Sequence, residues 1–288
     1  MDSRGEEEPG REGTAQASRG RGRPTRASPL LLLLAALILA LLVVAAVLLY
    51  RSLGESISGT SVAEDSIDSA GPKPHVLLTN ASGQVRVEGV EESETVEYEA
   101  TRYAMGSDPA AAKQRASEVP VDISREDSKI TIKTDGGRDT GADYDLRIPA
   151  GGSVEIESEA GDVTVSGLTG NVEVAAEAGD VTIGDAGGGI SVRVPQGDVA
   201  LADVNTDTGG AELEVGSGDV SLEDLILGTL EAKVEAGSVT LSGRFSGDGR
   251  VFVETGDIFA RLPAGDTRDL TLQTRVGNVL REPPDGGQ

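Results

Sequence analysis

Gly161-Asp162-Val163-Thr164-Val165 opens a pattern that returns along the rest of the chain and decides its fold. In each copy, a glycine and a small polar residue precede β-forming residues on alternate positions. Further copies begin at Gly179, Gly197, Gly218, Gly237, Gly256 and Gly277. Successive glycines lie 18, 18, 21, 19, 19 and 21 residues apart. A nearly fixed period with a turn signal and period-2 alternation indicates a β-solenoid, which is a scaffold architecture.

Each repeat has room for two short strands. After Val163 and Val165 the chain turns, and Val172 and Val174 begin a second alternating stretch. The alternating apolar residues should face inward, and the Thr, Ser, Glu and Arg between them should face water. We therefore predict about seven rungs over residues 151–282, stacked about 4.8 Å apart. Residues 283–288 are predicted to be disordered, and their two prolines suit a chain end that blocks further edge pairing.

Residues 75–150 precede the regular repeats and also read as strands. Alternating stretches occur at 85–89, 96–100 and 129–133. Between them, Asp108 and Pro109 resemble an N-cap and first helical position, and an alanine-rich stretch of good helix formers follows. We predict a strand-rich cap that contains one short helix and covers one open end of the solenoid.

Residues 30–50 form a membrane-span candidate. The stretch has no charge, consists almost entirely of Leu, Ala, Val and Ile, and is long enough to cross the hydrocarbon core of a bilayer as a helix. No convincing cleavage site follows, which favours a retained single-pass anchor. We predict a disordered tail over 1–29, a transmembrane helix over 30–50 and a polar linker over 51–74.

Charge predicts the orientation of this anchor. All six arginines of the first 50 residues lie before the span, at positions 4, 11, 19, 21, 23 and 26. The positive-inside rule therefore places the N-terminus in the cytoplasm and residues 51–288 outside. Those outer residues hold 19 Lys and Arg against 44 Asp and Glu. So acidic a domain is a poor partner for nucleic acid or anionic lipid and should gather cations or basic partners.

The repeated aspartates are the most metal-like feature of the sequence. Asp162, Asp180, Asp198 and Asp219 should stack one per rung, and Asp257 rejoins the column. A second acidic row lies three residues upstream, at Glu159, Glu177, Glu235 and Glu254. Carboxylates about 4.8 Å apart repel one another, which invites a bridging cation such as Ca²⁺.

The replacements in the aspartate column favour a different role. Ser238 and Asn278 stand in for aspartate; both keep a side-chain oxygen that can bond a turn N–H, and both lose the charge. The Gly-Gly-x-Gly-x-Asp nonapeptide of calcium-binding β-rolls is also missing. We predict turn capping, no specific metal site and a diffuse cation layer on the acidic face. The repeat glycines are predicted to be turn residues with positive φ rather than a phosphate cradle.

Catalysis has little support in the sequence. His75 is the one histidine and cysteine is absent, so neither a Ser-His-Asp triad nor a His- or Cys-rich metal cluster can form. A carboxylate-dependent, polysaccharide-acting enzyme is a remote alternative, but Trp is absent and aromatic residues are few. We predict no catalytic residues and no cofactor, and we interpret Phe245, Phe252 and Phe259 as core filler.

A family resemblance rests on several of these segments. The opening Asn80-x-x-Gly83-x-Val85-x-Val87-x-Gly89, the alanine-bearing helix, the segment Tyr144–Gly151 and the Gly-Asp-Val repeats together resemble the bacterial putative-adhesin family of β-strand-repeat proteins, formally a domain of unknown function. The resemblance covers about residues 75–282. It implies an extracytoplasmic β-solenoid, often membrane-anchored, in bacterial envelopes, and some relatives look like accessory proteins of envelope-stress systems. It supplies no catalytic residues.

These observations predict a membrane-anchored protein of the bacterial cytoplasmic membrane with an extracytoplasmic β-repeat domain. Its predicted function is non-enzymatic: an adhesion, scaffold or interaction module that binds an envelope protein or polymer. The alternative is an accessory sensor or regulator of an envelope-stress system. The predicted tail of 29 residues is short for a signalling element, which favours the interaction module.

Overall fold

A computed structural model describes residues 57–68, 71–137, 139–263 and 270–282. The predicted cytoplasmic tail over 1–29, the transmembrane helix over 30–50 and the C-terminal end over 283–288 lie outside these ranges. Among the residues described, no helix is long and apolar enough to cross a membrane. The compact unit that contains the repeats begins at Ser56.

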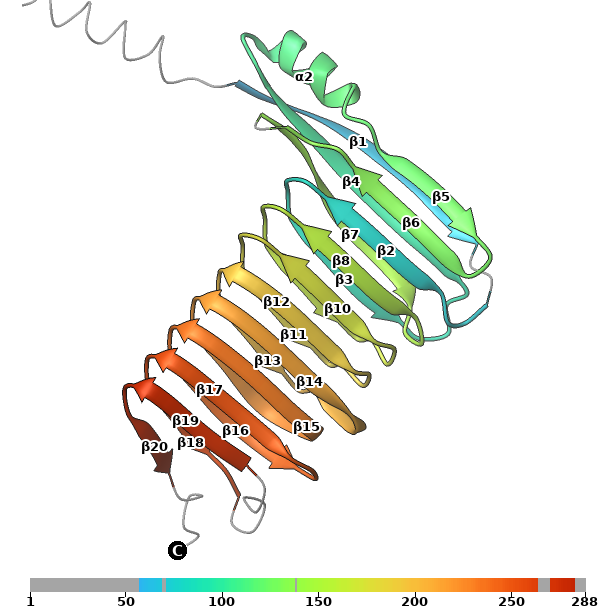
Figure 1. Ribbon diagram of the computed structural model, residues 1–288. Coiled ribbons are helices and arrows are strands. Elements are labelled where there is room, and N and C mark those ends of the chain that lie inside the picture. The colour runs from blue at the N-terminus through green and yellow to red at the C-terminus, as the bar shows by residue number, and fades with distance from the viewer. Residues whose placement is uncertain (1–56, 69–70, 138, 264–269, 283–288) are drawn as a thin grey trace, which may run out of the picture. The chain divides into compact units, whose positions relative to one another are not determined.

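The protein is an all-β solenoid with one helix, and the chain alternates between two stacks of parallel strands (Figure 1). We call these stacks sheet I and sheet II. The strands of sheet I, from the N-terminal end, are β6 (Lys129–Thr134), β2 (His75–Asn80), β8 (Ser153–Ser158), β10 (Val172–Ala176), β12 (Ile190–Gln196), the second half of β14 (Asn205–Ser217), the second half of β15 (Val220–Ala236), β17 (Gly249–Thr255) and β19 (Leu270–Val276). Those of sheet II are β7 (Thr140–Pro149), β3 (Val85–Val90), β9 (Val163–Ser166), β11 (Val181–Gly184), β13 (Val199–Ala202), the first part of β15, β16 (Val239–Phe245), β18 (Ile258–Arg261) and β20 (Val279–Glu282).

The seven Gly-x-Val copies stack in register in sheet II, as the repeat predicted. Val163, Val181 and Val199 are successive Cα partners, and the same position continues to Val279. These copies make about six turns. Alternate residues point inward and are fully buried, such as Val163 and Val165 in β9. Each rung therefore buries the apolar row of its neighbours, which is the main source of stability in a stacked repeat.

The repeat glycines sit at the corner between sheet I and sheet II. From Gly161 to Gly277 all seven have φ between 129° and 153°, a region that side chains other than glycine's avoid. A Cβ on Gly197 would lie 2.0 Å from the carbonyl oxygen of Gly179 in the preceding rung. The corner therefore needs glycine twice over, for its backbone conformation and for the close approach of the neighbouring rung.

The predicted cap differs from the structure in its first strands. β2 and β3 form a regular rung, which lies between the β6–β7 rung and the β8–β9 rung. Spatial order therefore departs from chain order here. Val85 and Val87 alternate like the repeats, and Gly83 (φ 124°) occupies the same corner as the repeat glycines, so this segment satisfies the rung geometry.

Asn80 explains the Asn-x-x-Gly opening of that rung. Its fully buried side chain donates through Nδ2 to the carbonyl oxygen of Gly83 at 3.1 Å and to that of Ala142 at 3.0 Å. The first bond closes the corner, and the second joins the rung to the one stacked above it. Beside it, Thr134 bonds the hydroxyl of Tyr144, and burial raises the pKa of that phenol.

The remaining N-terminal elements form the actual cap. β4 (Thr95–Gly106) pairs antiparallel with β7, and β5 (Asp122–Glu126) pairs antiparallel with β6. The predicted helix is confirmed as α2 (Pro109–Ser117), and the carboxylate of Asp108 accepts hydrogen bonds from the N–H groups of Ala110 and Ala111 at 3.0 and 2.9 Å. Antiparallel additions end the parallel stacking, so these strands close one end of the solenoid.

Strand β1 (Ile57–Asp68) lies inside the stretch that we predicted to be linker. It pairs antiparallel with β4 over its whole length, from Ile57 opposite Gly106 to Asp68 opposite Thr95. Its polar sequence lacks a strong apolar alternation, and the strand forms because the edge of β4 offers unpaired backbone groups. Helix α2 approaches this pair at Gly59 and Gly106, where a Cβ would fall within 2.6 Å of helix backbone atoms.

The corner geometry predicts that Gly197→Ala lowers the free energy of unfolding by about 3 kcal/mol or more, because the new methyl meets a carbonyl oxygen and φ is strained. The matched control is Gly184→Ala. Gly184 lacks positive φ, and the atom nearest to a new Cβ there is the Ala202 carbonyl oxygen at 3.8 Å. Urea unfolding of both variants would test the idea, and equal losses would contradict it.

Candidate functional site: two unlike faces of the solenoid

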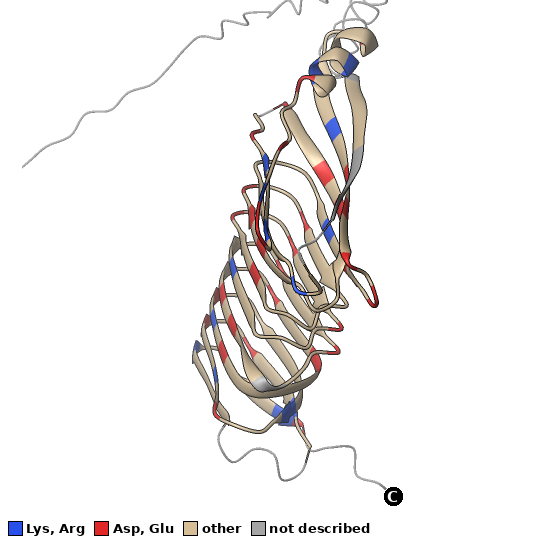
Figure 2. Cartoon of the chain, turned by 90° about the vertical axis from the view of Figure 1, so that its right-hand side faces the viewer, with Lys and Arg blue, Asp and Glu red and all other residues tan. Residues whose placement is uncertain are grey.

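The outward positions of sheet I are densely charged. Its two central outward rows, from β8 to β17, contain the following charged residues: Glu155, Glu157, Glu173, Arg193, Glu212, Glu214, Glu231, Lys233 and Arg250. Glu214 lies between two cations, 3.2 Å from Arg193 and 3.5 Å from Lys233. These ion pairs are exposed, so each adds little stability, and the two rows keep more carboxylates than cations. Figure 2 marks the acidic residues of the chain in red and the basic ones in blue.

An open groove of about 960 Å³ crosses this face from β10 to β19. Gly189, Gly210 and Gly249 are part of its lining. Along one side stand Glu173, Glu212, Glu231 and finally Arg250, which occupy one row of the sheet. Since strands repeat at about 4.8 Å, this groove spans roughly 24 Å along the solenoid axis.

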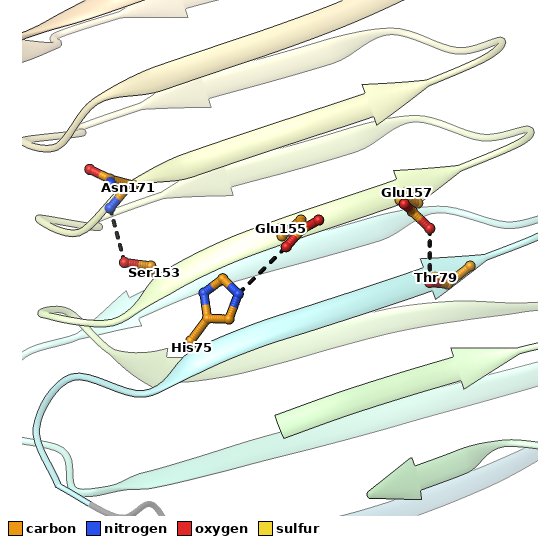
Figure 3. Close-up of polar contacts among 6 residues, drawn as sticks. All are labelled: His75, Thr79, Ser153, Glu155, Glu157 and Asn171. Carbon is orange, nitrogen blue, oxygen red and sulfur yellow. Dashed lines mark hydrogen bonds and ion pairs between the residues drawn. The ribbon is translucent and has the colours of Figure 1, made fainter. Parts of the chain in front are cut away.

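His75 lies at the start of β2 on the same face, within the stretch that was predicted to be strand-rich. Its Nε2 is 3.5 Å from a carboxylate oxygen of Glu155 on β8 (Figure 3). Farther along the same pair of strands, the Thr79 hydroxyl donates to the Glu157 carboxylate at 3.2 Å. These contacts tie neighbouring strands together.

The middle of sheet II is different: from β9 to β16 its outward rows are almost uncharged. From β9 to β16 they contain Thr164, Ser166, Thr182, Gly184, Ala200, Ala202, Ser221, Glu223, Thr240 and Ser242, of which Glu223 alone is charged. The two faces of one solenoid therefore offer opposite chemistry, with a charged surface on one side and a flat surface of hydroxyl and methyl groups on the other.

The C-terminal end of the sheet II face carries apolar residues that the sequence interpretation misplaced. Phe259, predicted to be core filler, is 41% exposed, and its register partner Leu280 is 51% exposed. Phe245 is buried as predicted, whereas Phe252 is half-buried and points outward from sheet I. Phe259 follows Ile258 in the position that threonine holds in Gly-Asp-Val-Thr, so aligning the repeats would have placed its ring outside.

The aspartate column has the predicted capping role, with one difference. Each aspartate caps the next rung rather than its own turn: an Asp180 Oδ1 accepts from the N–H of Asp198 at 2.9 Å, and an Asp198 Oδ1 accepts from that of Asp219 at 2.7 Å. Asp162, Asp219 and Asp257 act on their following rungs in the same way. The Ser238 N–H donates to Asp219. Within the described ranges, the Ser238 hydroxyl accepts no such bond from the N–H of Asp257.

The structure confirms that the predicted glutamates align between neighbouring strands. Glu159 and Glu177 follow paired residues of β8 and β10, and Glu235 lies opposite Glu254 in β15 and β17. Between these two pairs the row is interrupted by Pro195 and Gly216. Across the part of the chain that the structure describes, no group of three or more His, Cys, Asp or Glu side chains is arranged to hold a metal ion.

The family predicted from the residues is confirmed. A family model described as Toastrack DUF4097 matches residues 83–282, and the chain belongs to this family. A search among curated proteins finds no match.

Solved structures share the fold at low sequence identity. A putative adhesin from Bacteroides fragilis NCTC 9343 is 14% identical with a TM-score of 0.51, over 77% of this chain and 97% of that one. A putative cell adhesion protein from Clostridium sporogenes ATCC 15579 is 11% identical with a TM-score of 0.38, over 78% and 99%. A putative lipid binding protein from Parabacteroides distasonis ATCC 8503 is 11% identical with a TM-score of 0.31, over 77% and 94%. The first of these supports the solenoid fold and nothing finer.

The aspartate ladder predicts opposite outcomes for two substitutions at one position. Asp198→Asn keeps the oxygen acceptor and removes a like charge, so the free energy of unfolding should stay within about 0.5 kcal/mol or rise at low salt. Asp198→Ala leaves the Asp219 N–H without its side-chain partner and should cost about 1 kcal/mol.

Thermal melts in Ca²⁺ and in NaCl of equal ionic strength would accompany these measurements. A melting shift specific to Ca²⁺ in the parent protein, and lost in Asp198→Asn, would contradict capping and indicate a metal site.

Proposed function

We propose that this protein is a non-enzymatic interaction module that holds an extended, positively charged partner in the groove of sheet I. The observation that carries this proposal is the groove itself, whose row of Glu173, Glu212 and Glu231 runs along the solenoid axis. A partner that follows this axis meets a carboxylate of this row on β10, β14 and β15. Ser191 is the uncharged member of the row between Glu173 and Glu212.

The shape of the groove supports an elongated partner over a small molecule. Small-molecule sites are concave and mostly apolar, and they bury most of the ligand. This groove is open, with charged residues and glycines in its lining, and it crosses strands from β10 to β19. A basic peptide segment or a cationic envelope polymer lying across the rungs satisfies both its length and its charge.

A carboxylate-dependent glycosidase is less well supported. Such enzymes hold two carboxyl groups on opposite sides of a scissile bond. Glu212 and Glu231 are instead register neighbours that point from the same face of adjacent strands. The groove is also lined without a single aromatic residue to stack against a sugar ring.

The proposed location is extracytoplasmic, with residues 30–50 as a membrane anchor and the N-terminus in the cytoplasm. The support is the uncharged apolar stretch and the arginines before it. The cysteine-free sequence allows a direct test. Ser124→Cys, on exposed β5, should react with a membrane-impermeant maleimide in intact cells, whereas Ser18→Cys should react only after lysis. Labelling of both residues in intact cells, or of neither, would contradict the orientation.

Neutralising the groove should weaken binding of a model polycation. The variant Glu173→Gln, Glu212→Gln, Glu231→Gln in the full-length chain is expected to lose at least tenfold in affinity for poly-L-lysine, measured by biolayer interferometry in 50 mM NaCl. Each carboxylate of the row would otherwise contact the polymer, and a tenfold loss corresponds to about 1.4 kcal/mol.

A matched variant separates the groove from net charge. Glu91→Gln, Glu97→Gln, Glu126→Gln changes the charge equally at exposed positions outside the groove. This control should bind nearly as tightly as the parent. If both triple variants weaken equally, binding follows diffuse charge and the groove is not the site.

A further inference from the structure

A second surface, on the opposite sheet, has the chemistry of a different ligand. We infer that the depression around Phe259 and Leu280, at the C-terminal end of the sheet II face, binds an uncharged sugar ring of a glycan. This inference does not depend on the groove of sheet I, because the two sites share no residue.

The depression combines an apolar platform with hydrogen-bonding groups. It measures about 330 Å³, and its polar lining includes Thr240, Ser242 and Glu223. Phe259 and Leu280 are Cα partners on β18 and β20, so their outward side chains lie next to each other. A sugar ring has C–H groups on its faces and hydroxyls around its rim, and an exposed aromatic ring beside hydroxyl and carboxylate acceptors complements both.

The one cation among the residues that line the depression is paired within it. Arg261 is paired with Glu282, with a guanidinium nitrogen 3.0 Å from the carboxylate oxygen. Glu223 accepts a hydrogen bond from the Ser221 hydroxyl at 3.0 Å. The cation is therefore neutralised by its own neighbour, and the carboxylates act as acceptors for ligand hydroxyls. Carboxylates of this kind bind the hydroxyls of an uncharged ligand through charge-assisted hydrogen bonds.

The exposure of Phe259 has no structural cause within the described residues. Its row contains Thr164, Thr182, Ala200, Ser221 and Thr240 at the preceding rungs, and these small residues satisfy the fold at the same outward position. An aromatic ring there adds contact area to the surface and nothing to the core. Large exposed apolar side chains that gather at one place mark interaction sites.

Other occupants fit less well. Glu223, Asp224 and Glu282 border the depression and repel nucleic acid or anionic lipid. A polycation fits sheet I better, because the row of acidic residues there is longer than the acidic border of this depression. A second copy of this chain would bring together two molecules with a net charge of −24 each, which opposes association at low salt.

The test uses the full-length protein and three soluble, uncharged glucan hexamers, namely cellohexaose, laminarihexaose and maltohexaose. Isothermal titration calorimetry should show saturable binding of at least one hexamer, with Kd of millimolar order or tighter. Phe259→Thr restores the repeat residue, so the fold is kept, and it should weaken this binding about tenfold through the loss of ring stacking. The control Phe252→Thr removes an aromatic ring from the opposite face and should leave the affinity unchanged.

Several results would overturn the inference. One is the absence of binding to all three hexamers; another is equal loss in Phe259→Thr and Phe252→Thr. A third is concentration-dependent dimerisation of the parent, seen by sedimentation velocity and abolished by Phe259→Thr, because the patch would then hold a second copy. Poly-L-lysine binding by Phe259→Thr should stay at the parent level, so failure of this site and failure of the sheet I groove give different results.

Discussion

The corner between sheets I and II, where a glycine of one rung meets the carbonyl oxygen of the glycine before it, is the constraint on which the structure depends. Every repeat must turn there with positive φ and at a separation that excludes a methyl group. Once this corner is fixed, the next two inward residues take fixed places in the core. Parallel stacking carries the register from rung to rung, so a single corner geometry sets the alignment of all the columns.

The same corner explains why acidic residues can stack without a metal. The residue after each glycine sits where its side chain reaches the N–H of the following rung, and that N–H faces the corner rather than a strand partner. A carboxylate placed there gains a charge-assisted hydrogen bond, which offsets repulsion from the next carboxylate along the column. Ser238 and Asn278 stand in the column as recipients, since the backbone N–H of each donates to the aspartate of the preceding rung.

The features that depend on periodicity could be predicted from the sequence. The solenoid, the helix after Asp108, the aspartate caps and the aligned glutamate row all follow from spacing along the chain. Sequence reasoning missed features that depend on pairing partners distant in sequence. Strand β1 is polar and exists because β4 offers it an edge, and the β2–β3 rung lies below a rung formed later in the chain. The outward position of Phe259 could have been predicted, because the alternation that buries Ile258 and Ala260 turns the ring between them outward.

Alternation also explains how one rod presents two unrelated surfaces. Inward residues are held by the columns above and below them, whereas outward residues contact mainly their row neighbours and water. Substituting an outward residue therefore changes a face without changing the core, and the two faces can vary independently. Such a scaffold can keep its shape while the residues on its faces change. In this chain the carboxylates of sheet I and the hydroxyls and phenyl ring of sheet II lie on opposite sides of the same core, so an occupant of one face leaves the other open.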